Sequence, residues 1–125
     1  VDTQHGRIFS GCRSGVMAVS DVNAGKVVAT MPIGMGVDGA GYDPSTGDAF
    51  ASAADGTLTV IHQDAPDRYR VVQTLTTAVG SRTLGLDVTR HRLFVAAAKF
   101  NQAAAGARGR GAMVPGSFSL LEIGR

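Results

Sequence analysis

The sequence places four charged residues in short glycine-containing segments. Arg13 lies in CRSG, Asp38 in GVDG, Asp55 in ADG and Arg82 in GSRT. Together these residues would give a surface of mixed charge that binds a ligand or a partner. The two aspartates have a structural alternative, because they could cap turns, with Asp55 and Gly56 forming a two-residue hairpin loop. Arg82 also has a structural alternative, because it could form an ion pair between neighbouring parts of the fold.

A longer segment from Lys99 to Pro115 carries further cations. Lys99, Arg108 and Arg110 could attract phosphate or an acidic surface. Long loops in compact domains are disproportionately functional or disordered, so the alternative is a solvated insertion. Phe100 is the one aromatic residue in this segment. Without Trp or Tyr to stack on bases, the case for binding single-stranded nucleic acid is weak.

Other kinds of site find less support. His5, His62 and His91 lack the paired spacing that metal sites use, so we expect structural roles for them. We expect Cys12 to be a small buried residue and not a nucleophile, since no histidine stands near it in the repeat described below. The glycine-rich segments lack the strand-loop-helix context of a phosphate cradle. We therefore predict no catalytic residue, no metal site and no cofactor.

Composition indicates one folded domain. The chain has 125 residues, of which 44% are hydrophobic and 18% charged. A formal net charge of +2 is too small to imply a polyanionic partner by itself. One cysteine excludes an intrachain disulfide, and no apolar run approaches the ~20 residues of a membrane span. The chain opens at Val1 with no leader pattern, from which we expect a processed, truncated or excerpted chain.

An internal repeat organises the sequence. RIFSGC, DAFASA and RLFVAA bring Phe9, Phe50 and Phe94 into register at intervals of about 40 to 45 residues. The segments around them are short and rich in β-branched, aromatic or small residues, with Asp- and Gly-containing turns between, which indicates strands joined by hairpins. These segments are GVMAV (15–19), KVVATMPIG (26–34), GAGYDP (39–44), GTLTV (56–60), YRVVQTLTT (69–77), LGLDVT (84–89) and GSFSL (116–120).

Four antiparallel strands in each repeat of this length are typical of a β-propeller blade. We predict an all-β fold of ten strands in about three blades, as a partial propeller within residues 1–125. The repeats would cover about 1–38, 39–82 and 83–125. The first blade would lack its inner strand and the last its outer strand. Unpaired blade flanks invite association, so we expect either an excerpt from a longer propeller or assembly with another chain.

Blade topology decides which loops meet. The loops between the second and third strands, and between a fourth strand and the next blade, lie on one side, which we call the mouth face. We predict that this face holds Arg13, Asp38, Asp55, Arg82 and the segment 99–115. The opposite face would hold the turns at 2–7, 21–26, 43–48, 62–68 and 87–92. Because propeller ligands commonly meet the central channel at one mouth, the mouth face is the candidate site.

The repeat resembles that of the YVTN-repeat (YncE-like) β-propeller proteins. The resemblance rests on VMAVSD followed by KVVATMPIG, on GVDGAGYDPSTGDAFASAADGTLTVI (36–61) and on the ending VPGSFSLLEIGR (114–125). IFSG, AFAS and LFVA stand where the family has its YVTN tetrapeptide. The resemblance covers essentially the whole chain and implies the last three of seven blades. It also implies a non-enzymatic or unassigned propeller, often exported or periplasmic, with DNA or cell-surface partners suspected for some members.

These observations favour a non-catalytic interaction or ligand-binding module. Its predicted contacts are Arg13, Asp38, Arg82, Lys99, Arg108 and Arg110. One alternative is part of an enzyme or cofactor-binding propeller whose site is completed by missing blades or by another chain. The other is DNA binding through the arginine-bearing segment, for which we expect strong salt dependence.

Overall fold

The chain forms ten β-strands, as the repeat predicts. The computed structural model describes residues 1–103, 105–106, 109 and 111–124. All regular secondary structure in these residues is strand. The strands are β1 (Arg7–Cys12), β2 (Val16–Asp21), β3 (Lys26–Pro32), β4 (Val37–Asp43), β5 (Asp48–Ala53), β6 (Thr57–Ala65), β7 (Arg68–Thr76), β8 (Arg82–Asp87), β9 (Arg92–Ala97) and β10 (Ser119–Gly124).

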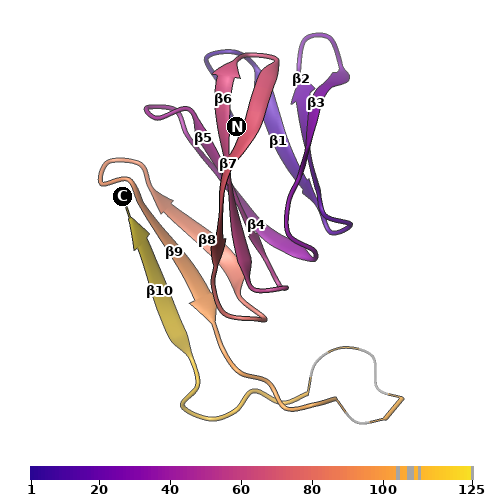
Figure 1. Ribbon diagram of the computed structural model, residues 1–125, viewed down its shortest axis with the longest axis vertical. Helices are drawn as coiled ribbons and strands as arrows, with labels where there is room; N and C mark the ends of the chain where they lie inside the picture. The colour runs from indigo at the N-terminus through magenta and orange to yellow at the C-terminus, as the bar shows by residue number, and fades with distance from the viewer. Residues whose placement is uncertain (104, 107–108, 110, 125) are drawn as a thin grey trace.

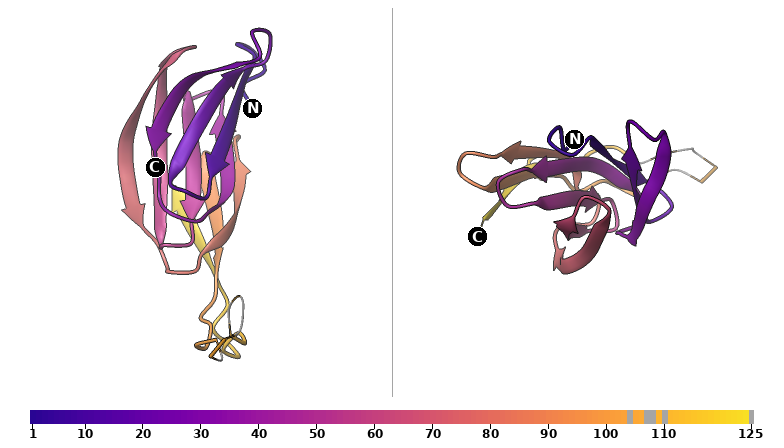
Figure 2. Two further views of the ribbon diagram at one scale, coloured as in Figure 1. Left: turned by 90° about the vertical axis from the view of Figure 1, so that its right-hand side faces the viewer. Right: turned by 90° about the horizontal axis from the view of Figure 1, so that it is seen from above.

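The strands form three antiparallel sheets, which lie side by side as blades of a partial β-propeller (Figures 1 and 2). Their orders are β1-β2-β3, β4-β5-β6-β7 and β10-β9-β8. The middle blade therefore has all four strands, and among the described residues the first blade has no inner strand and the last no outer one. This arrangement confirms the predicted fold class, strand number and strand order.

Strand β10 starts later than the sequence suggested. The prediction placed it at residues 116–120, but the structure has it from Ser119 to Gly124. Gly116 has a φ of 72°, and the amide of Ser117 donates to the carbonyl of Val114 at 3.2 Å. A turn therefore occupies the start of the predicted segment, and the strand follows it.

The hairpin loop at Asp55 is also longer than predicted. Ala53 pairs with Thr57, so the loop holds three residues, and Gly56 closes it with a φ of 90°. The amide of Gly56 donates to the carbonyl of Ala53 at 3.1 Å. Gly15 ends the equivalent loop of the first blade in the same conformation, with a φ of 88°. Three-residue hairpins commonly use this left-handed last position.

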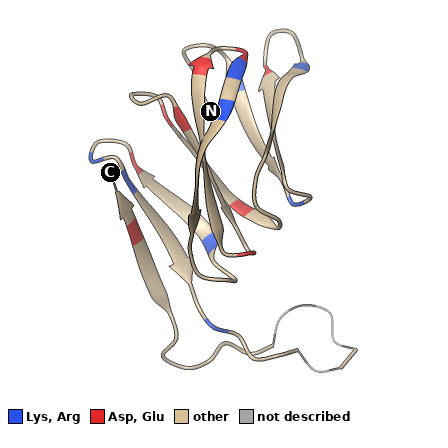
Figure 3. Ribbon diagram, in the orientation of Figure 1, with Lys and Arg blue, Asp and Glu red and all other residues tan. Residues whose placement is uncertain are grey.

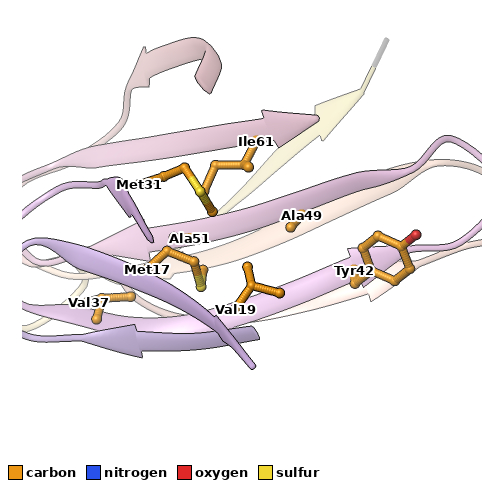
Figure 4. Close-up of a cluster of buried hydrophobic side chains, with 8 residues drawn as sticks. All are labelled: Met17, Val19, Met31, Val37, Tyr42, Ala49, Ala51 and Ile61. Carbon is orange, nitrogen blue, oxygen red and sulfur yellow. The ribbon is translucent and has the colours of Figure 1, made fainter. Parts of the chain in front are cut away.

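Buried side chains between the blades form the core. The cluster between the first and middle blades includes Met17, Val19, Met31, Val37, Tyr42, Ala49, Ala51 and Ile61 (Figure 4). Phe9 adds an aromatic contact, since its ring stacks on Tyr42 at a centroid distance of 4.8 Å and meets the edge of Tyr69 at 5.7 Å. Leu58, Val60, Leu93, Val95 and Ala97 are buried on the middle and last blades.

Glycines allow the inner strands of neighbouring blades to approach closely. A Cβ on Gly39 of β4 would lie 2.7 Å from the backbone nitrogen of Leu84 and 2.8 Å from its Cβ, both in β8. A Cβ on Gly41 would lie 3.0 Å from a methyl carbon of the same leucine. The small residues of the predicted strand segment GAGYDP (39–44) therefore suit a crowded inner strand.

We predict that Gly39→Ala destabilises the fold, because the added methyl overlaps backbone atoms that cannot move without shifting a blade. Overpacking of this kind costs about 1–3 kcal/mol in the free energy of unfolding. Gly85→Ala is the matched control on the next inner strand, where a Cβ would find its nearest neighbour at 3.9 Å. Urea denaturation measures both variants. Equal stability of the two would contradict the close-approach argument.

Candidate functional site

A series of backbone hydrogen bonds joins the loops of the mouth face across the blades. The carbonyl of Arg13 accepts from the amide of Gly36 at 2.9 Å. The carbonyl of Gly36 accepts from Ala54 at 3.1 Å, and that of Ala54 from Gly80 at 2.7 Å. Four loops that are distant in sequence are thereby held side by side. The prediction that they share one face is confirmed.

Asp55 ties two of these loops together. One of its carboxylate oxygens accepts from the amide and the hydroxyl of Thr57, at 3.1 and 2.7 Å. The other accepts from the amide of Met35 in the preceding loop, at 2.7 Å. Burial acts to raise the pKa of Asp55, but these hydrogen bonds outweigh it and hold the pKa below its ordinary value of 3.8. Asp55 is therefore a turn cap that also joins the first blade to the middle one.

A β-bulge at Thr83 places Arg82 beside Asp38. The register between β8 and β9 shifts between Arg82 and Leu84, and Thr83 has a φ of 59°, which a β-branched residue rarely adopts. The amide of Thr83 donates to one carboxylate oxygen of Asp38 at 3.2 Å. The other oxygen lies 3.6 Å from an Nη atom of Arg82. The ion pair between neighbouring blades, considered as an alternative from the sequence, is thus present.

This ion pair leaves the guanidinium of Arg82 poorly satisfied. A separation of 3.6 Å is a charge contact and not a hydrogen bond. The Nε of Arg82 is buried and has no hydrogen-bond partner among the described residues. The whole side chain is 42% exposed. Arg82 therefore keeps donors that an incoming acceptor could use.

Arg82 lines a pocket of about 370 Å³, which we call the Arg82 pocket. Its walls come from the β5–β6 loop, the β7–β8 loop, the first residue of β8 and both sides of the long segment after β9. They are Ala54, Val79, Gly80, Arg82, Ala98, Phe100, Asn101, Ala103 and Gly111. Arg82 is the one charged residue among these described wall residues.

The two ends of the long segment pair with each other through backbone hydrogen bonds, and we call this paired part the stem. The amide of Asn101 donates to the carbonyl of Ala112 at 2.9 Å, and the amide of Val114 donates to the carbonyl of Lys99 at the same distance. Phe100 and Met113 form a β-bridge between these two bonds. The stem thus fixes the backbone of the pocket residues Phe100 and Asn101.

The predicted site residues divide into four groups. Asp38 and Arg82 come together. Arg13 is exposed, its side chain has no hydrogen bond or ion pair within the described residues, and it does not line the Arg82 pocket. Lys99 is exposed beside the pocket residues Ala98 and Phe100, while Arg108 and Arg110 lie outside the described residues. Figure 3 shows cationic and anionic residues together at the mouth-face ends of the strands.

Sequence reasoning missed Thr83, Asn101 and the small residues of the pocket wall. The bulge has no clear signal, because threonine at a left-handed position is against its own preference. Asn101 follows Lys99 and Phe100, which were singled out, yet only the paired stem gives it a position. Its place as a polar residue inside the expected long loop was the available hint.

The histidines have structural roles, as predicted. The Nδ1 of His5 lies 2.7 Å from Asp2, and that of His62 lies 2.8 Å from Asp48. His91 of the last blade contacts Asp43 of the middle blade at 2.7 Å. The aspartates in these three pairs are nearly inaccessible to solvent. The described residues contain no group of three or more His, Cys, Asp or Glu that could hold a metal ion.

Cys12 is exposed, so the prediction that it is buried was wrong. It lies at the end of β1, which is an edge strand of its sheet and has β2 as its neighbour among the described strands. An edge position leaves its outer side uncovered.

A smaller groove of about 140 Å³ lies between the middle and last blades. Its walls are largely apolar, and the Asp43 carboxylate at one end already accepts hydrogen bonds from Ser45 and contacts His91. The Arg82 pocket is the better candidate because its charged group is the less satisfied of the two. In the described part of the chain, no helix has the length and apolar character needed to cross a bilayer.

Comparison with known proteins supports the fold and goes no further. No protein-family model matches the chain, and no curated protein matches it. Among solved structures it is similar to dihydro-heme d1 dehydrogenase NirN in complex with DHE, with a TM-score of 0.63 and 14% identity over 94% of this chain. It is also similar to the β-propeller domain of Cps50 (Swd1) from Myceliophteria thermophila, with a TM-score of 0.56 and 13% identity over 89% of this chain. The chain spans 22% and 40% of the lengths of these two proteins.

We predict that Asp55→Ala loosens the mouth face and removes part of the acid sensitivity of the fold. A depressed pKa means that the ionised carboxylate stabilises the folded state above pH 3.8 and loses this effect as the pH falls through the folded value. The variant should lose about 1–2 kcal/mol of unfolding free energy at pH 6, with a smaller loss at pH 3.

Urea denaturation at the two pH values tests this expectation. Asp64→Ala is the control, since Asp64 makes an ion pair with the exposed Arg70, and it should change stability by less than about 1 kcal/mol. A loss in Asp55→Ala that is the same at both pH values would contradict the role of the carboxylate charge.

Proposed function

We propose that the chain is a non-catalytic binding module and that the Arg82 pocket holds its ligand. The module would be an arc of a propeller of the YVTN-repeat (YncE-like) kind, which the repeat pattern of the sequence supports. This resemblance also supports an exported or periplasmic location for the protein.

The observation that carries the proposal is the state of Arg82. Its side chain lines a pocket of about 370 Å³ and has a buried Nε without a partner within the described residues. The volume lies in the range of small-molecule sites, about 300–1,000 Å³. A strained backbone at Thr83 holds the arginine there, and such strain is often found at functional sites.

A second candidate function is part of an enzyme. One of the similar structures is a dehydrogenase in complex with DHE, so a propeller of similar shape can form part of an enzyme. In that case further blades or another chain would supply the reacting groups, and this arc would contribute binding residues. Turnover that requires an added second chain would favour the enzyme over the simple binding module.

We also propose that another chain or further blades cover the ends of this arc. β1 and β10 each pair with one neighbour among the described strands. Apolar side chains on these strands are uncovered, with Ile8 39% and Leu120 58% exposed. Exposed strand edges with apolar residues favour association.

We predict that ligands of the module shift the amide resonances of the pocket residues. Nuclear magnetic resonance of the chain, titrated with a fragment library of acids, bases and neutral molecules, should give shifts that cluster at Ala54, Gly80 and Asn101. Arg82→Ala should lower the affinity for the tightest-binding fragment by about tenfold or more, because the substitution removes a charged hydrogen-bond donor.

Arg90→Ala is the matched control for charge, since Arg90 is exposed on the opposite face and pairs with Asp87. It should leave fragment affinity unchanged. Hits that lie elsewhere, or that tolerate Arg82→Ala, would contradict the proposed site. Arg13→Ala tests the remaining mouth-face arginine, and unchanged affinity would remove it from the site.

We predict that the chain of residues 1–125 associates at micromolar concentration. Sedimentation velocity should show species heavier than the 12.8 kDa monomer, and Leu120→Lys should shift them toward the monomer. A single monomeric species of the unmodified chain would make the assembly proposal wrong.

A further inference from the structure

We propose that the ligand of the Arg82 pocket is a small organic acid with a single carboxylate on an apolar body. This inference rests on the proposed function and names the chemical class of the ligand. It follows from three properties of the described part of the pocket: one available cation, one nearby anion and apolar walls.

The available cation is the Arg82 guanidinium. No hydrogen bond joins it to any other described residue, and its contact with Asp38 is 3.6 Å long. A planar guanidinium presents a fork of N–H donors that matches the two oxygens of a carboxylate. A carboxylate in the pocket would accept hydrogen bonds that Arg82 does not make within the described chain.

The nearby anion limits the charge of the ligand. The Asp38 carboxylate already compensates part of the Arg82 charge, and it is fixed by the Thr83 amide at 3.2 Å. A second negative charge on the ligand would lie close to Asp38 with no further cation among the wall residues that the structure describes. At about 4–6 Å, two like charges near a protein surface repel by several kcal/mol before solvent screening. A monoanion is therefore preferred to a dianionic phosphate.

The walls determine the rest of the molecule. Ala54, Val79, Ala98 and Ala103 give small apolar surfaces, and Phe100 gives an aromatic one. Asn101 is the other polar side chain in the wall, and its amide can donate to a ligand oxygen or accept from a hydroxyl. Such a pocket suits an apolar group about the size of a benzene ring or a short alkyl chain.

The experiment compares three probes that share a phenyl ring: phenylacetate, its neutral isostere phenylacetamide, and phenyl phosphate. Each is titrated into the chain at pH 7 and followed by the amide resonances of Gly80 and Asn101. We expect phenylacetate to bind at least about tenfold more tightly than phenylacetamide, because charge-assisted hydrogen bonds are the stronger kind. Phenyl phosphate should bind more weakly than phenylacetate.

Variants of Arg82 and Asp38 test whether the charges of these two residues cause the expected ligand preference. Arg82→Ala should remove the preference of phenylacetate over phenylacetamide, and Arg82→Lys should keep part of it, since the charge stays but the fork is lost. Asp38→Asn should improve the affinity for phenyl phosphate more than that for phenylacetate, by about threefold or more, because it removes the repulsion. Arg90→Ala should leave all three affinities unchanged.

Several results would overturn the inference. Equal binding of phenylacetate and phenylacetamide would show that the charge of Arg82 is not used. Tighter binding of phenyl phosphate to the unmodified chain would make the ligand a phosphate. No shift at Gly80 and Asn101 with any of the three probes would also reject the carboxylate class. The fragment library then decides separately whether the Arg82 pocket binds other molecules, so failure of the ligand class and failure of the site are distinguishable.

Discussion

The close approach of the inner strands β4 and β8 is the constraint on which the rest of the structure depends. It requires glycine at Gly39, because a side chain there would overlap the backbone of Leu84. Only at this separation can Asp38, the residue before that glycine, reach the amide of Thr83 in the next blade. The packing of two blades and the geometry of the candidate site are therefore set by the same few atoms.

Much of this arrangement could be predicted from the sequence, because the repeat carries it. Phe9, Phe50 and Phe94 bring the blades into register, and Asp-Gly turns mark the ends of strands. Antiparallel strands alternate in direction, so every second loop lies on the same face of the blades. The sequence alone therefore predicted that Asp38 and Arg82 share one face. These are properties of a pattern repeated along the chain, and a repeated pattern is visible in one sequence.

The parts that could not be predicted are local departures from that pattern. The bulge at Thr83 adds one residue to β8 and turns Arg82 toward Asp38, yet the residue types around it do not require a bulge. The exposure of Cys12 depends on whether a neighbouring strand covers β1, which the residues of β1 do not encode. The pocket wall at Asn101 depends on the paired stem, which joins segments on either side of a long loop. Each of these features comes from tertiary contacts that local propensity does not determine.

The two faces of the arc differ in how well their charges are satisfied, and this difference identifies the candidate site. On the opposite face, burial acts to raise the pKa of Asp43, but hydrogen bonds from Ser45 and His91 outweigh it and lower the pKa. Asp43, Ser45 and His91 already have hydrogen-bond partners in one another, so a role in stabilising the fold is enough to explain them. On the mouth face, a buried donor without a partner costs about 1–3 kcal/mol, and a residue such as Thr83 at positive φ costs a similar amount. The 3.6 Å contact of Arg82 with Asp38 and the hydrogen bond from the Thr83 amide to the same carboxylate offset only part of these costs. The incompletely satisfied guanidinium of Arg82 is therefore the feature that supports the proposed binding site, because the exposed part of this side chain can still donate hydrogen bonds to a ligand.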